Sequence, residues 1–171
     1  MKPVKFKSIL YKPDDHGGWH FVRVEGKIGD KFEKKDGSRR VVCTINGTES
    51  FQCALMPSGS DYILVVNKTK RDRLQIVAGD RISVELKVDE SRYGLPMPEE
   101  FKEVLNQDPE GHRLFHDLTP GRQRSLIYMI GKVKDVDRRI HTALICVDHL
   151  KKNDGRIIGE RLHEELKRPI F

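Results

Sequence analysis

Two histidines four residues apart are the first candidates for chemistry in this sequence. His112 and His116 share one face if their segment is helical, and two imidazoles on one helix face are an arrangement that binds zinc. No acidic residue stands between them as in HExxH, and no third ligand is evident, so we expect a structural pair and no metal site. Asp14, Asp15 and His16 precede a Gly-Gly pair, and we expect them to form a solvated turn.

The cysteines are the second candidates, because a thiolate can act as a nucleophile. Cys43, Cys53 and Cys146 each stand beside an apolar residue, where a thiol behaves as a small hydrophobic group unless a base lowers its pKa. Three cysteines without a CxxC motif do not form a disulfide framework and fit a reducing compartment. The sequence also lacks GxSxG, a phosphate-binding P-loop, and GxGxxG after a strand. We therefore expect neither an enzyme nor a cofactor.

Two clusters of basic residues are the strongest functional signal. Guanidinium groups bind phosphate or carboxylate oxygens with two parallel hydrogen bonds, so either cluster could hold an anion. A solubilising surface is the competing interpretation, which we favour for each cluster, because long basic side chains cover apolar surface with their stems. The first cluster is Lys68, Lys70, Arg71, Arg73 and Arg81, and the second is Arg122, Arg124, Lys132, Lys134, Arg138 and Arg139.

Trp19 is the only tryptophan of the chain. It either anchors the core, which is the interpretation that we favour, or lines a pocket at the mouth of a barrel. The candidate ligand- or anion-binding residues are therefore Trp19, Lys68, Arg71, Arg73, Arg81, Arg124, Lys134, Arg138 and Arg139.

The elements that must hold these residues begin with a strand-rich front half. Alternating hydrophobicity predicts strands, and Asn46-Gly47 suits the positive φ angles of a tight hairpin. The nearly continuous apolar run 62–66 predicts a strand buried on both faces, after a break at 57–60. Residues 68–74 form a candidate short helix. The other predicted strands cover 4–11, 19–24, 40–45, 50–55 and 81–88.

After Asp89 the hydrophobic period changes to that of helices. Prolines mark the joint, and helices are expected over 99–106, from 109, and from 120, where Thr119 is a candidate N-cap. Whether 121–151 is one helix or two stays open. Apolar residues at 136, 140, 144 and 147 predict a buried stripe, and 160–167 predicts a solvated helix. We thus expect an α+β protein with a small β-barrel over 1–94, a helical segment over 95–152 and a tail over 153–171.

The order of several short motifs resembles a known family. An uncharacterised bacterial barrel family shows similar motifs, and its members are grouped by fold with AbrB and MazE transcription-factor barrels as double-split β-barrels. A helical YdeI/OmpD-associated segment commonly follows the barrel. The resemblance covers about residues 4–150, implies that fold, and carries no established activity. The barrel motifs are Trp19-His20-Phe21-Val22, Val42-Cys43-Thr44-Ile45-Asn46-Gly47, Leu55-Met56-Pro57, Tyr62-Ile63-Leu64-Val65-Val66, Arg71 and Gly79-Asp80-Arg81-Ile82-Ser83-Val84. The helical motifs are Phe115, Leu118-Thr119-Pro120, Arg124, Ile130, Lys134 and Arg138-Arg139-Ile140.

Composition limits the remaining function classes. Of the 171 residues, 37% are hydrophobic, which suffices for a core, and no apolar run reaches the roughly 18 residues of a membrane span. The first residues lack the apolar core of a secretory signal, so we expect a cytoplasmic protein. The net charge of +6 permits an anionic partner without requiring one.

Two function hypotheses follow. We prefer a non-catalytic binding module for a small anionic ligand or a protein partner, because no catalytic constellation is recognisable. The alternative is a nucleic-acid-binding protein, by analogy with AbrB-type barrels. Aromatic residues make up only 7% of the chain, so surfaces on which bases could stack are poorly supplied.

Overall fold

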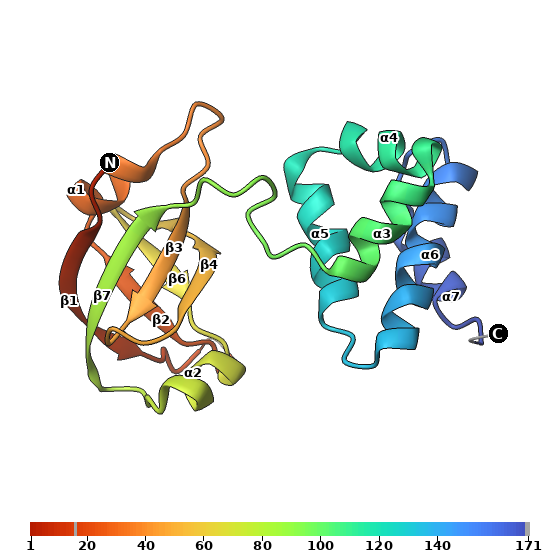
Figure 1. Ribbon diagram of the computed structural model, residues 1–171. Coiled ribbons are helices and arrows are strands. Elements are labelled where there is room, and N and C mark those ends of the chain that lie inside the picture. The colour runs from red at the N-terminus through yellow and green to blue at the C-terminus, as the bar shows by residue number, and fades with distance from the viewer. Residues whose placement is uncertain (16, 170–171) are drawn as a thin grey trace. The chain divides into compact units, whose positions relative to one another are not determined.

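The computed structural model describes residues 1–15 and 17–169 and divides the chain into two compact units, Met1–Glu90 and Ser91–Phe171. The first unit is a curled antiparallel sheet, and the second consists of helices (Figure 1). The predicted α+β class, with a barrel-like front and a helical back, is therefore confirmed. His16, which was expected in a solvated turn, lies outside the described residues. The predicted boundaries between the segments 1–94, 95–152 and 153–171 stay predictions.

The sheet owes its curl to a strand that changes partner. β1 pairs with β7 from Val4 to Ile9 and with β2 at Leu10 and Tyr11. Within the described residues the strand order is β4-β3-β7-β1-β2-β6-β5, and every neighbouring pair is antiparallel. The strands are β1 (Val4–Tyr11), β2 (Phe21–Val24), β3 (Arg40–Ile45), β4 (Ser50–Ala54), β5 (Met56–Ser58), β6 (Asp61–Val65) and β7 (Arg81–Val88). The sheet thereby forms a half-barrel around one core.

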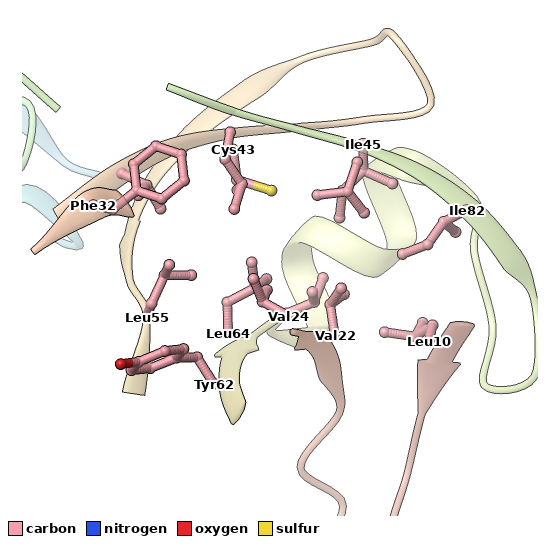
Figure 2. Packing of buried hydrophobic residues seen from close by; sticks show 14 of the residues in the cluster. Leu10, Val22, Val24, Phe32, Cys43, Ile45, Leu55, Tyr62, Leu64 and Ile82 are labelled. Atoms are coloured by element: carbon pink, nitrogen blue, oxygen red, sulfur yellow. The ribbon is translucent and has the colours of Figure 1, made fainter. Parts of the chain in front are cut away.

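The core of this unit is filled from alternate positions of its strands. In β7, Ile82, Val84 and Leu86 are buried on one face, as the alternation predicts. Figure 2 shows side chains from several strands, among them Leu10 and Ile45, pointing into the same interior. Full burial of each such side chain contributes about 1.5–3 kcal/mol, so this interior is the main source of the unit's stability.

The predicted hairpin forms, and two other details of the sheet differ from expectation. Asn46 and Gly47 have φ angles of 55° and 65°, the left-handed pair that a tight hairpin turn needs. The prediction that 62–66 is buried on both faces is wrong, since only alternate residues of β6 are buried and Ile63 is half-exposed. β6 faces the core on one side only. The short strand β5 (Met56–Ser58) overlaps the predicted break at 57–60.

Short helices cover the ends of the sheet. The predicted helix over 68–74 is confirmed as α2 (Lys68–Leu74). The sequence did not predict α1 (Gly26–Gly29) and the 3-10 turn η1 (Asp30–Phe32). A Cβ at Gly29 would lie 2.0 Å from the Tyr62 ring, so this close approach needs a glycine.

Five helices are described in the second unit. They are α3 (Glu99–Gln107), α4 (Pro109–Asp117), α5 (Pro120–Gly131), α6 (Val136–Lys152) and α7 (Gly159–Glu165). Their apolar faces share a core in which the rings of Phe101 and Phe115 meet edge to face, with centroids 4.9 Å apart. Thr119 occupies the N-cap position of α5 without a capping side-chain hydrogen bond.

The question of one or two helices over 121–151 is answered by Asp135. Its Oδ1 accepts a hydrogen bond of 2.9 Å from the Arg138 amide, which caps a separate helix α6. The predicted stripe on α6 is partly wrong, because Val136 and Leu144 are 52% and 42% exposed. The buried face instead includes Ala143, Ile145, Cys146, Val147 and Leu150.

The terminal helix is docked rather than solvated. In α7, Leu162 is 2% exposed. The buried His149 of α6 donates from Nδ1 to Glu165 Oε2 over 2.9 Å, and its Nε2 accepts from the Ile158 amide over 3.0 Å. α7 (Gly159–Glu165) therefore packs against α6. Among the described helices, none combines the length and the apolar character that crossing a bilayer requires.

Candidate functional site

Trp19 lies in a turn that is tied to the end of β6. Gly17 and Gly18 have φ angles of 55° and 86°, which glycine adopts without steric cost. His20 Nδ1 donates to the Gly18 carbonyl over 2.7 Å, and the Val66 amide donates to the His20 carbonyl over 3.0 Å. The indole is left 57% exposed. The favoured interpretation of Trp19 as a core anchor is therefore wrong.

Arg71 is brought to the same place by the start of α2. The Asn67 side chain accepts from the Lys70 amide over 2.9 Å and so fixes the first turn of this helix. Arg71 Nη1 then donates to the Val66 carbonyl over 2.6 Å. A guanidinium carries five N–H donors, so this contact orients the fork and leaves further donors for a ligand.

Lys68, Arg71 and Trp19 line one hollow of about 230 Å³. Lys68 Nζ lies 2.7 Å from Asp72 Oδ2, and these side chains are 81% and 64% exposed. Such an exposed pair contributes less than about 1 kcal/mol, so an anion can compete for the ammonium group. The other residues around the hollow are Gly17, Gly18, His20, Val65, Val66 and Asn67. Three of the nine predicted residues thus come together.

Arg73 lies on another side of α2, against the β3–β4 hairpin. Its Nη2 is 2.9 Å from Glu49 Oε1, and the neighbouring Lys70 Nζ lies 4.5 Å from the centroid of the Phe51 ring. Arg73 therefore faces a carboxylate and does not line the hollow of Trp19.

Arg81 lines a separate groove of about 890 Å³ on the outer face of the sheet. The exposed side chains of Ile9 and Tyr11 give this groove an apolar part. Lys7 and Arg23 add two further cations to it. The first basic cluster is therefore divided among three places, and Arg81 is not near Trp19 in any described hollow.

The second basic cluster is not gathered into one site either. Arg139 is held by Glu100 Oε1 over 2.7 Å and by the carbonyls of Val133 and Lys134 over 2.8 and 3.0 Å. Its guanidinium thus joins α3 to the turn between α5 and α6. Arg138 and Lys134 are exposed, and Arg124 is half-buried on α5.

The paired histidines have structural contacts. The Nε2 atom of His116 forms a hydrogen bond of 2.8 Å with the Tyr93 hydroxyl. Its Nδ1 atom donates to the His112 carbonyl over 2.8 Å. Both ring nitrogens of His116 are thus engaged within the protein. In the described part of the chain, no three His, Cys, Asp or Glu side chains are grouped as a metal site would require.

The three thiols differ in environment. Burial raises the pKa of Cys146 to about 12. The Cys43 thiol donates to Cys53, which raises the pKa of Cys43 and lowers that of Cys53, and Lys70 and Arg40 lower the latter further. Cys53 is partly exposed, whereas Cys43 and Cys146 are buried. No histidine base accompanies Cys53 in these contacts.

Sequence reasoning missed His20 and Asn67, which line the hollow beside the predicted residues. The Gly-Gly pair before Trp19 signalled a turn. Nothing in the sequence signalled that this turn would bond to the strand end that precedes α2, because a contact between distant segments depends on sheet order.

The fold and the hollow define an α+β protein in which a half-barrel with a basic and aromatic hollow precedes a helical unit. Residues 6–86 match the family described as a domain of unknown function (DUF1905). Residues 95–153 match the family described as Bacteriocin-protection, YdeI or OmpD-Associated. The front of the chain is therefore similar to DUF1905 domains and its helical part to YdeI or OmpD-associated segments, which confirms the resemblance. No curated protein matches it.

Proposed function

We propose that this protein is a non-catalytic binding module whose sheet unit binds a small carboxylate or phosphate compound. The observation that carries the proposal is the meeting of Trp19 with Lys68 and Arg71 around one hollow. These residues come from two segments that are distant in sequence, so the folded sheet is what creates the site.

The three side chains offer complementary contacts to such a ligand. Arg71 can bind two anion oxygens with parallel N–H bonds, and Lys68 adds a compact positive charge. The exposed face of Trp19 can pack against an apolar or aromatic part of the ligand. The volume of about 230 Å³ is below the roughly 300–1,000 Å³ of sites for drug-sized molecules, which favours a compact ligand.

The surroundings support binding rather than catalysis at this place. The ring of His20 is oriented by its bond to the Gly18 carbonyl, and the described residues that line the hollow include no serine, cysteine or carboxylate. We place the protein in the cytoplasm, since the free thiols of Cys43, Cys53 and Cys146 suit a reducing compartment.

The experiment is isothermal titration of the full chain with inorganic phosphate, citrate and benzoate. A hydrogen bond to a charged group contributes about 1.5–3 kcal/mol, so Arg71→Gln should weaken binding by roughly 10- to 150-fold. Arg73→Gln is the matched control, because Arg73 is on the same helix and contacts Glu49 instead. Equal weakening in both variants, or no binding of any of the three anions, would refute the proposed site.

The same variants distinguish nucleic-acid binding. A duplex that covered a broad basic surface would lose affinity in both arginine variants. Its binding constant would also fall with salt with a logarithmic slope of about −5 for six neutralised phosphates. That pattern would favour the alternative hypothesis over the small-anion site.

A further inference from the structure

We propose that the groove between α3 and α6 binds an amphipathic helix of a partner protein, with an apolar stripe flanked by lysine or arginine. This surface belongs to the helical unit and is independent of the anion hollow in the sheet unit. The groove has a volume of about 790 Å³.

The floor of the groove is apolar. Val104 of α3 and Ile140, Leu144 and Val147 of α6 line it. Leu144 is 42% exposed, although it lies on the same helix as the buried Ala143 and Cys146. Val104 and Ile140 are half-buried, and together with the exposed Leu144 they offer the contact that an apolar stripe at helical spacing would cover.

The rim of the groove has the opposite charge to the chain as a whole. Five carboxylates and one lysine line it, whereas the chain carries a net charge of +6. They are Glu99, Glu100, Glu103, Asp108, Asp148 and Lys151. A rim of this sign repels anions and attracts a cationic segment.

Some of these carboxylates are already paired, and two are not. Glu100 binds Arg139, Asp108 binds Lys151 over 2.9 Å, and Asp148 binds Lys152 over 2.8 Å. Glu103 accepts a hydrogen bond from the neutral Gln107 side chain. Among the described residues, neither Glu99 nor Glu103 has a cationic partner. These two are four residues apart and so share one face of α3.

The spacing of floor and rim specifies the occupant. Ile140 and Leu144 lie four residues apart on one side of α6, which fits apolar anchors at successive helical turns of a ligand. Glu99 and Glu103 run parallel to that floor along α3, where basic residues four apart on the ligand helix can meet them. A helix with acidic flanks would place like charges along the same rim.

The test uses a fluorescein-labelled 18-residue peptide with leucine at helical spacing and lysine elsewhere, and a second peptide with glutamate in place of lysine. Fluorescence anisotropy with the full chain should show at least tenfold tighter binding of the lysine peptide. Leu144→Glu and Glu103→Lys should each weaken it at least tenfold. The matched controls are Val136→Glu, on the same helix outside the groove, and Glu164→Lys on α7, which should bind as the wild type does.

Leu144 and Glu103 are exposed, so circular dichroism should show that both variants fold. Equal binding of the lysine peptide by all variants would mean unspecific attraction and would overturn the proposal. Sedimentation of the protein alone gives the other decisive result. A dimer that Leu144→Glu dissociates would identify a second copy of this chain as the occupant and would also overturn it.

Discussion

Gly111 permits the close approach of α4 and α6, and its substitution by alanine measures that approach. A Cβ at this position would lie 2.3 Å from Val147 Cγ1 and 3.1 Å from the Asp108 carboxylate. Carbon atoms in contact prefer about 3.5–4.0 Å, so the helices or the Val147 side chain must move. Val147 is 3% exposed and has little room to do so.

The expected change in the free energy of unfolding of Gly111→Ala follows from two opposing effects. Alanine in an open helix is about 1 kcal/mol more favourable than glycine, whereas overpacking of a core costs about 1–3 kcal/mol. Gly121→Ala on α5 is the control for the first effect, because the nearest atom to its Cβ would be Arg124 Nη2 at 4.0 Å. We expect Gly111→Ala to be less stable than Gly121→Ala by about 1–3 kcal/mol.

The assay is urea denaturation followed by circular dichroism at 222 nm, which reports on the helices. Val147→Ala removes the clashing methyl groups, so the double variant Gly111→Ala with Val147→Ala should be more stable than the sum of the single changes by about 1 kcal/mol or more. Strict additivity, or a Gly111→Ala variant as stable as Gly121→Ala, would refute the described packing of α4 against α6.

Two further predictions concern single side chains. Cys53 should react with a thiol reagent before Cys146, whose raised pKa and burial should protect it until the protein unfolds, as labelling followed by mass spectrometry would show. Asp108→Ala should cost about 1 kcal/mol of stability near neutral pH, since Asp108 caps α4 by accepting from the Gly111 amide. Lys151 and that amide lower the pKa of Asp108 below 3.8 in the folded protein. Its contribution is therefore present above that value and is lost as the pH falls through the lower folded pKa. Urea midpoints of the wild type and of Asp108→Ala at a series of pH values would check this. A difference between the two midpoints that grows as the pH falls would contradict it.

The sequence predicted most elements whose pattern is local. Strict alternation identified β7, and Asn46-Gly47 identified the hairpin, because side-chain period and turn conformation are properties of a few consecutive residues. The stripe on α6 was misplaced for a related reason. Several apolar residues lie on more than one face of that helix, and only its neighbours decide that Cys146 is buried while Leu144 is exposed.

The candidate site could be predicted only in its residue types. Basic side chains near Arg71 indicated an anion, but the sequence could not separate Arg71 from Arg73, which lie two residues apart and face different surroundings. The position of Trp19 depends on a hydrogen bond between His20, which precedes β2, and Val66, which follows β6. Contacts of this kind follow from strand order, which hydrophobic periodicity does not specify.

The intrinsic fluorescence of Trp19 is the most direct measure of anion binding in the hollow, because the chain has no other tryptophan. Titration with phosphate, citrate or benzoate should give a saturable change in the wild type and in Arg73→Gln, at the concentrations at which calorimetry detects binding. The midpoint should rise at least tenfold in Arg71→Gln. Calorimetric binding without any response of Trp19, or an unaltered midpoint in Arg71→Gln, would contradict the account.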